Sequence, residues 1–377
     1  MPSGRFAHGR DAKPELAQRS PWNTSSTDWY FPGDLDYPGA GKADRTAAGA
    51  RRSGIGSDRT ILPGAAPASI TTTVAVKQTW PTLAPATGSS ATPTDTNYKS
   101  QWALTSATAG IDVVNAWQNY TGLGVKIGVI DDGVDYTNPD LAPNYLFSMQ
   151  YDAVTPDGCA LGTTSDPHGT TVAGIIAAAR NGVGVVGVAY NAGIAGIRIG
   201  YGAAGSAAQY ADALNHLASN GFDIGNCSWG YSIPFQDNFN SIWSSSKTAI
   251  LNDVQTGRHG LGIPIVFAAM NNRAAGDNVN YHNYQNDPYV ITVASTTSAG
   301  KVAPTSNPGA AILVSAPGQN VITDARTGTA GWSGGNTVAV EGTSYAAPTV
   351  SGVIALMLQA NPNPIPSPEG LALQCRR

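Results

Sequence analysis

The sequence has few charged residues and almost no cysteine. Asp, Glu, Lys and Arg make up 12% of its 377 residues, and the formal net charge is -4. Nucleic-acid-binding proteins normally show a basic patch or an excess of Lys and Arg, so this class is not expected. The cysteines, Cys159, Cys227 and Cys375, are too few for a disulfide framework and too scattered for a zinc site. At most one pair of them could form a disulfide bond.

The sequence also lacks long hydrophobic runs. No apolar segment approaches the length of a membrane span, and residues 1–20 contain charges without the apolar stretch of a signal peptide. Its 44 Gly and 25 Pro are too many for a helix bundle and fit a loop-rich α/β protein. With 42% hydrophobic residues, the chain can bury a sizeable core in one large domain or two ordinary ones.

Composition divides the chain into three parts. Residues 1–94 are rich in Gly, Ala, Pro, Ser and Thr, so we expect a low-complexity, disordered segment. Within it, Ile70–Lys77 alternates apolar and polar residues and could form an isolated strand. We expect residues 95–363 to form the folded domain. Residues 364–377 form a Pro-rich tail, and we expect that the chain is truncated or reads abnormally there.

From Asp95 onward, short apolar runs alternate with longer segments of helical period. The expected strands are 125–131, 194–199, 224–229, 264–270, 289–296 and 311–315. The expected helices are 111–120, 168–179, 207–219, 239–255 and 344–360. Apolar strands separated by helices predict a doubly wound α/β fold, with a mostly parallel sheet and helices on both faces. In such folds, functional residues gather beyond the carboxyl ends of the strands.

Four residues with complementary chemistry lie at the ends of these elements. They are Asp131 at the end of the first strand, His168 at the start of a helix, Asn271 after a strand, and Ser344 at the start of an apolar helix. Each could be purely structural, as a turn residue, a buried imidazole or a helix cap. Together they supply an orienting carboxylate, a base, an oxyanion donor and a nucleophile. Their joint occurrence favours a single active site.

Four motifs resemble those of the subtilisin-like serine peptidases, in that family's order of Asp, His and Ser. They are VIDDG from Val129, HGTTVAGIIAA from His168, AAMN from Ala268 and GTSYAAP from Gly342. Further segments, such as CSWG from Cys227 and GDNVNYHNYQN from Gly276, are most similar to the kexin and furin branch. The resemblance implies the three-layer subtilisin-like fold.

The same resemblance implies a serine endopeptidase that acts through an acyl-enzyme. Ser344 would be the nucleophile, His168 the base, Asp131 its orienting carboxylate and Asn271 the oxyanion donor. The alternative is a non-catalytic peptide-binding protein on the same fold, inactive through truncation. An unrelated α/β hydrolase is disfavoured because no Gly-x-Ser-x-Gly motif surrounds Ser344.

A calcium site is also implied by the resemblance. Its expected ligands are the side chains of Asp95, Asp140 and Asn181 and the carbonyl groups of Ala179, Val183 and Val185. The alternative without a metal is a Gly-rich turn with two solvated aspartates. A second calcium site is doubtful: Asp277 matches one of its ligands in the kexin branch, but Asn307 replaces a Glu.

Substrate contacts are expected at Asp132, Ser228, Trp229 and Gly230. Ile233 and His282 replace the acids of the kexin-like pocket, so strict cleavage after Arg or Lys is not expected. Met270 replaces the family's Gly before the oxyanion Asn and could crowd the pocket for the residue before the scissile bond. Asp132 could favour a basic residue one position further away, or could be only a turn carboxylate.

Partners and location follow from the resemblance. We expect protein or peptide substrates, no nucleic acid, no membrane and a monomeric state. By family resemblance we expect a secreted or extracytoplasmic protein, although no signal peptide is visible in the chain.

Overall fold

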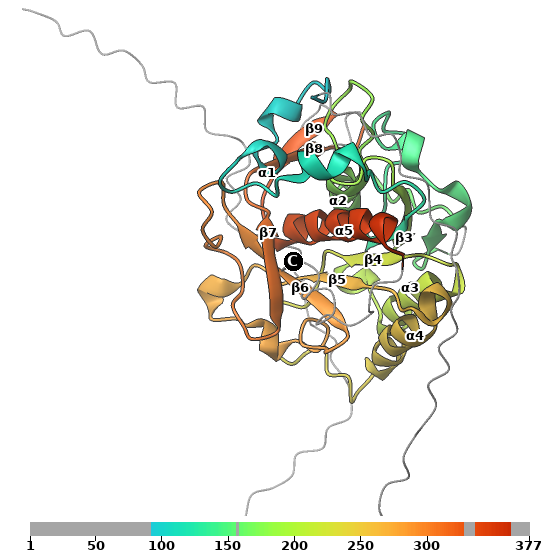
Figure 1. Cartoon of the computed structure of the whole chain (residues 1–377). Helices are drawn as coiled ribbons and strands as arrows, with labels where there is room; N and C mark the ends of the chain where they lie inside the picture. Colours follow the sequence, from blue (N-terminus) through green and yellow to red (C-terminus); the bar gives the residue numbers. More distant parts are fainter. Residues whose placement is uncertain (1–91, 156–157, 328–335, 363–377) are drawn as a thin grey trace, which may run out of the picture.

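The computed structural model describes residues 92–155, 158–327 and 336–362 (Figure 1). The expected N-terminal disorder, the strand at Ile70–Lys77 and the Pro-rich tail lie outside these ranges, apart from residues 92–94. They therefore stay predictions, as do the domain limits drawn from composition.

Seven strands form one parallel sheet in the order β2-β3-β1-β4-β5-β6-β7. They are β1 Lys126–Asp131, β2 Tyr151–Asp152, β3 Gly193–Arg198, β4 Ile224–Cys227, β5 Ile265–Ala268, β6 Val290–Thr296 and β7 Ile312–Pro317. The predicted parallel α/β fold is confirmed. Because β1 lies between β3 and β4, the strand order reverses at β1. The carboxyl end of β1, at Asp131, is thus the place where such folds bind ligands.

Four longer helices cover the sheet. They are α2 His168–Ala177, α3 Ala207–Ser219, α4 Ser244–Gly260 and α5 Thr343–Ala360. Helices α2 and α5 pack together over one face, and α3 and α4 pack together on the other (Figure 1). Short helical segments lie at Tyr98–Ser100, α1 Trp102–Thr105, Val113–Gln118, Ala142–Asn144, Phe147–Met149, Gly202–Ala204, Arg273–Ala275 and Val279–Tyr281.

The central strand β1 is buried on both faces. Ile127 and Val129 belong to the core under α2 and α5, whereas Ile130 belongs to the core that includes Leu214 and Leu217 of α3. Alternate side chains of a strand point to opposite faces, so a strand covered on both sides needs apolar residues throughout. This explains the continuous apolar run that ends at the polar Asp131.

Two predicted helices are shorter or shifted in the structure. The segment 111–120 forms only a 3₁₀ helix, Val113–Gln118, which begins after Asp112 at φ 50°. Helix α4 starts five residues later than predicted, at Ser244, because a turn at Asn238 precedes it: its side chain accepts from the Asn240 amide at 2.9 Å. Residues 257–259 depart from helical geometry at its end. Side-chain bonds of Asn compete locally with helix formation.

Three short strands were missed by the sequence prediction: the edge strand β2 and the pair β8 and β9. Strands β8 Val321–Asp324 and β9 Thr337–Val340 form an antiparallel pair outside the main sheet. Four-residue segments are too short to produce a clear periodic signal. The pair matters for the site region because β8 packs against α2 and carries the buried residue Asp324.

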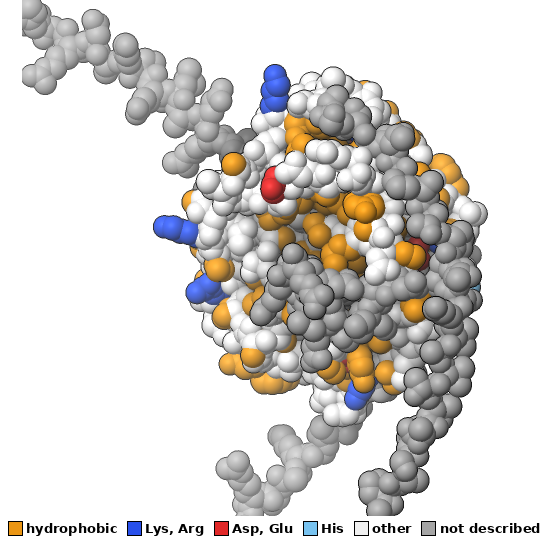
Figure 2. All heavy atoms as spheres, viewed as in Figure 1, with side chains coloured by type: hydrophobic (Ala, Val, Ile, Leu, Met, Phe, Trp, Pro, Cys, Tyr) orange, Lys and Arg blue, Asp and Glu red, His pale blue; other side chains and the backbone are white. Residues whose placement is uncertain are grey.

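On the face shown in Figure 2, charged side chains are scattered singly among polar and hydrophobic ones. Across the described ranges, no helix is both long and apolar enough to cross a membrane. Cys159 and Cys227 are not bonded to each other, and Cys375 lies outside the described residues.

Candidate active site

A buried carboxylate holds the imidazole of His168. The Nδ1 atom of His168 lies 2.8 Å from Oδ1 of Asp131, and these two side chains are 1% and 0% exposed. A buried charge is costly unless it is paired, and this contact supplies the partner. When Nδ1 carries the proton that Asp131 accepts, Nε2 is the basic nitrogen of the ring. The arrangement therefore fixes both the orientation and the tautomer of a potential base.

Asp131 accepts two further hydrogen bonds on the same oxygen. The hydroxyl group of Tyr201, just beyond β3, donates to Oδ1 at 2.9 Å, and the Asp132 amide donates at 2.8 Å. Sequence reasoning missed Tyr201 because no motif marks it. Its position could only have been found by knowing that β1 and β3 are neighbours with Asp131 opposite Arg198.

The carboxylate of Asp132 is directed into the fold. It is 3% exposed, and its two oxygens accept from the amides of His168 (3.0 Å) and Gly169 (2.7 Å) at the start of α2. A carboxylate at a helix N-terminus satisfies amides that have no acceptor within the helix. In this structure Asp132 therefore positions the backbone of His168, and the substrate contact expected at Asp132 stays a prediction. Burial, followed by the charge of Asp131, raises its pKa well above the usual value.

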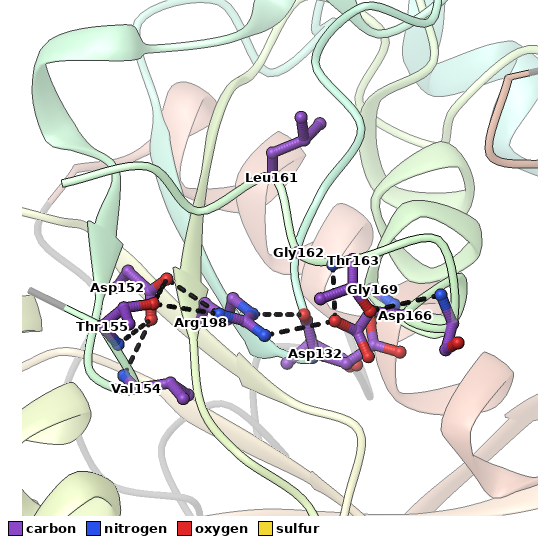
Figure 3. A network of polar contacts seen from close by, with 12 residues as sticks. Asp132, Asp152, Val154, Thr155, Leu161, Gly162, Thr163, Asp166, Gly169 and Arg198 are labelled. Atoms are coloured by element: carbon purple, nitrogen blue, oxygen red, sulfur yellow. Dashed lines mark hydrogen bonds and ion pairs between the residues drawn. The ribbon is translucent and has the colours of Figure 1, made fainter. Parts of the chain in front are cut away.

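The loop before His168 is held by an arginine that sequence reasoning also missed. Figure 3 shows Arg198 of β3 between Asp152 and Asp166, with N–O distances of 2.9 and 3.2 Å. Its Nε atom donates to the Asp132 carbonyl at 3.2 Å. Arg198 therefore connects the end of β1 with the turn that leads into α2, and restrains both partners of the Asp131–His168 pair.

Ser344 and Asn271 meet at the N-terminus of α5. The Asn271 side chain accepts from the Thr343 amide at 2.8 Å through Oδ1. Gly342, at φ 138°, allows this close approach, because an added Cβ would lie 3.2 Å from Asn271 Nδ2. The ring of Tyr345, next to Ser344, lies 5.5 Å from the ring of His168. The structure thus brings the four predicted residues together at one edge of the sheet.

The segment Ser228–Gly230 borders the same place through its backbone. The carbonyl group of Ser228 accepts from Ser344 Oγ at 3.0 Å. The Trp229 side chain, by contrast, is 3% exposed and donates to the Ile130 carbonyl at 3.0 Å. It stacks on Tyr210 in the core. Contact with a substrate at Trp229 can therefore involve only its backbone.

His282 does not line a substrate pocket. It is fully buried, with Nε2 2.9 and 3.1 Å from the oxygens of Asp277 and Nδ1 3.6 Å from Asp237. Asn307 also donates to Asp277, at 2.9 Å. Burial alone lowers the pKa of His282, but the two carboxylates raise it to about 9. These contacts occupy the carboxylate that a second calcium ion would need, whereas Ile233 is 40% exposed at the surface.

The His282 cluster predicts a specific dependence of stability on pH. Because folding raises the pKa of His282, the cluster stabilises fully below its unfolded pKa of about 6.5 and loses this contribution as pH rises through about 9. The pKa of Asp277 is lowered despite burial, so its contribution is lost as pH falls below about 4. Urea unfolding should show a fall in stability on the order of 2–3 kcal/mol from pH 6 to pH 9. In His282→Gln this fall should shrink markedly; an unchanged fall would contradict the assignment.

Two aspartates face the loop that follows α2. Asp95 Oδ1 accepts from the amides of Asn181 (2.9 Å) and Gly182 (2.8 Å), and Asp140 Oδ2 accepts from Val185 (2.9 Å). They are 4% and 1% exposed, so the alternative of solvated aspartates is wrong. In the described part of the chain, Asp95 Oδ2 and Asp140 Oδ1 are buried without a hydrogen-bond partner. Buried, unsatisfied carboxylate oxygens fit a hard cation.

Asp324 adds a third carboxylate that the sequence did not reveal. It is fully buried, and among the described residues neither of its carboxylate oxygens has a well-formed hydrogen bond. An added Cβ at Gly184 would contact both Asp140 and Asp324, which places the two carboxylates side by side. Even so, the described ranges contain no cluster of three or more acidic, His or Cys side chains arranged to hold a metal. A cation here would rely on backbone carbonyl groups as well.

The fold and the site together define a subtilisin-like α/β protein. The edge of the parallel sheet carries a buried Asp–His pair, and the ring of Tyr345, next to Ser344 at the start of α5, lies 5.5 Å from the ring of His168. The chain belongs to the Subtilase family, whose model matches residues 122–372.

Similar sequences include proteins of the kexin branch. The chain is 35% identical over 288 residues to proprotein convertase subtilisin/kexin type 7 of Mus musculus, covering 71% of this chain and 36% of that protein. It is 35% identical over 281 residues to kexin of Saccharomyces cerevisiae, covering 71% and 33%. The chain thus spans about a third of the length of these curated relatives.

Solved structures support the fold. A cold-adapted subtilisin-like serine proteinase is 28% identical, with a TM-score of 0.54, covering 67% of this chain and 81% of that one. A protease of Pseudoalteromonas arctica is 29% identical, with a TM-score of 0.62, covering 73% and 89%.

Proposed function

We propose that the protein is a serine endopeptidase in which Asp131, His168 and Ser344 form the catalytic triad. The observation that carries this proposal is the buried contact of 2.8 Å between Asp131 and His168, beside the helix start that carries Ser344. Membership of the Subtilase family and similarity to kexin-like proteins support it. The competing function, a peptide-binding protein without catalysis, would have no need of an imidazole held in one tautomer.

The proposed reaction gives each of these groups one role. Ser344 Oγ rotates away from the Ser228 carbonyl and attacks the scissile carbonyl carbon, while its proton passes to His168 Nε2. Asp131 stabilises the imidazolium that forms. The oxyanion accepts hydrogen bonds from Asn271 Nδ2 and the Ser344 amide. His168 then gives the proton to the leaving amine, and a water molecule, activated in the same way, hydrolyses the acyl-enzyme.

Replacing Asn271 tests the oxyanion role separately from the triad. Asn271→Ala should lower kcat for peptide hydrolysis by about 100- to 1,000-fold, with little change in KM, because the amide binds the charge that develops in the transition state. Steady-state kinetics on a peptide anilide measures both constants. The control is Asn307→Ala, which removes an amide from the Asp277 cluster instead. Equal effects of the two variants on kcat would contradict the oxyanion role of Asn271.

We further propose one calcium ion held by Asp95, Asp140, Asn181 and the carbonyl groups of Ala179, Val183 and Val185. The unsatisfied oxygens of Asp95 and Asp140 support this set. The chemistry that calcium supplies is structural: it neutralises buried carboxylates and fixes the loop after α2. We also propose protein or peptide substrates and a secreted or extracytoplasmic location, which the similarity to kexin supports, and a monomeric enzyme.

Calcium removal gives a test that does not depend on activity. Chelation should lower the melting temperature by roughly 5–10 °C compared with a hundredfold excess of calcium over Kd, because a ligand of the folded state stabilises it. Asp140→Asn should weaken this response strongly. Asp112→Asn, a change at an exposed aspartate in the left-handed region, should leave it intact. Identical melting with and without calcium would rule the site out.

A further inference from the structure

We propose that Met270 fills the space for the side chain that precedes the scissile bond, so that the enzyme cleaves after small residues such as Gly, Ala or Ser. This inference rests on the proposed peptidase function and specifies its substrates. It concerns the residue on the acyl side of the cleaved bond, which becomes covalently attached to Ser344.

The two groups that act on the scissile carbonyl locate this residue. Ser344 Oγ lies 3.0 Å from the Ser228 carbonyl oxygen, and Asn271 contacts the backbone at Thr343 through its side chain. A carbonyl group held between Ser344 and Asn271 places its acyl-side residue beside the segments that border these two groups. Asn271 lies in the segment directly after β5, and the Ser228 carbonyl that contacts Ser344 Oγ lies in the segment directly after β4.

These two segments lie side by side because β4 and β5 are paired strands. Gln285, which is 1% exposed, connects them: its Nε2 donates to the carbonyl groups of Trp229 (3.1 Å) and Ala268 (3.2 Å). The space between the segments is therefore bounded by fixed backbone on both sides. A substrate side chain can enter this space only where neither of the two bounding segments projects its own side chain into it.

The side chain of Met270 extends from the segment after β5 to Gly230 in the segment after β4. An added Cβ at Gly230 would lie 2.6 Å from Sδ and 3.1 Å from Cγ of Met270, and 2.5 Å from Nε2 of Gln285. The Met270 side chain is thus in contact with the backbone at Gly230, and it is 6% exposed. Interiors are close-packed, so a large second side chain cannot share this space without displacing Met270.

The backbone at Met270 would suit glycine. Its φ is 70°, in the left-handed region where a residue with a Cβ is strained. The Asn307 amide donates to the Met270 carbonyl at 3.0 Å and holds this conformation. Glycine at this position would relieve the strain, so Met270→Gly is expected to fold. A side chain retained at a strained position next to the reacting groups indicates a role for that side chain.

Basic side chains are disfavoured for a second reason. Asp237 and Asp277, the acids of the neighbouring loops, already contact His282 at 3.6 and 2.9 Å. Neither carboxylate is available to a guanidinium without breaking this cluster. Buried Arg or Lys without a carboxylate partner is strongly unfavourable.

The test compares four peptide anilides that differ only in the residue before the anilide: Ala, Gly, Phe and Arg. The wild-type chain should cleave the Ala peptide with a kcat/KM at least tenfold above those of the Phe and Arg peptides. Met270→Gly should raise kcat/KM for the Phe peptide by about 10- to 100-fold, the value of burying one large apolar side chain. The Ala peptide should change less than threefold. Ile233 replaces a pocket acid of the kexin branch but is exposed at the surface. Ile233→Ala should therefore leave the ratios of kcat/KM between the four peptides unchanged.

Labelling of Ser344 by a fluorophosphonate, which has no acyl-side residue, separates this inference from the proposed function. Wild-type protein that is labelled but cleaves the Phe or Arg peptide as well as the Ala peptide would overturn the role of Met270 alone. Unchanged ratios in a labelled Met270→Gly variant would do the same. Absence of labelling in folded protein would overturn the peptidase function and this inference with it.

Discussion

Ser344→Ala should abolish peptide hydrolysis, with a fall in kcat of about 10⁶-fold relative to the unaltered chain. The variant removes the nucleophile, so no acyl-enzyme can form, and only binding and oxyanion stabilisation remain. The lost hydroxyl group makes one hydrogen bond, to the Ser228 carbonyl, so folding should change little. Release of the chromophore from a peptide anilide, with melting temperature measured in parallel, tests both expectations.

A second serine of α5 provides the matched control. Ser351 donates to the buried side chain of Asn226 at 2.8 Å, on the face of α5 that packs on the sheet. Ser351→Ala should cost about 1 kcal/mol of stability and leave kcat nearly unchanged. Equal hydrolytic activity of Ser344→Ala and the unaltered chain would contradict the role of Ser344 as the nucleophile.

Asp131→Asn should lower kcat by about 10⁴-fold while the fold persists. The amide is nearly isosteric, but its NH₂ group cannot accept a proton from His168 Nδ1, and the ring loses both its productive tautomer and its counter-charge. Kinetics between pH 6 and 9 measures the loss, which should be largest near neutral pH.

Tyr201→Phe tests the same carboxylate with a milder change. It removes only one of the three donors to Asp131 Oδ1 and retains the ring. A single hydrogen bond to a charged group is worth about 1.5–3 kcal/mol, so kcat should fall by roughly 10- to 150-fold at most. A larger loss in Tyr201→Phe than in Asp131→Asn would contradict the assigned roles.

The catalytic constellation was predictable because each member lies at the end of a long, strongly patterned element. Asp131 ends a continuous apolar strand, and His168 and Ser344 begin helices whose bodies are small and apolar. Parallel strands place their carboxyl ends at one edge, so the predicted order of elements already implied that these residues meet. In the structure His168 contacts Asp131, and its ring lies 5.5 Å from that of Tyr345, the neighbour of Ser344.

The supporting residues could not be predicted because their partners are distant in sequence. Arg198 and Tyr201 act on residues 32 to 70 positions away, and Asp324 lies in a strand too short for a pattern. Burial was equally hard to foresee: the side chains of Asp132 and His282 are both polar, yet each is used inside the fold. Sequence spacing gives no measure of the direction in which such a carboxylate or imidazole points.

The far end of α5 also became clear only in three dimensions. The sequence pattern of α5 does not show what holds its last turn in place. In the structure, Oε1 of Gln359 accepts from the amides of Thr121 and Gly122, both at 2.7 Å. This contact anchors the last turn of the helix that carries Ser344 to the segment preceding β1.

The most direct test of the peptidase assignment is active-site titration with a fluorophosphonate, followed by peptide mapping. The account predicts one label per folded molecule, on Ser344, with labelling lost in Ser344→Ala and strongly slowed in His168→Ala. Calcium should be present throughout, and cooperative thermal unfolding should establish that each sample is folded. Folded protein that remains unlabelled, or is labelled at a serine other than Ser344, would contradict the account.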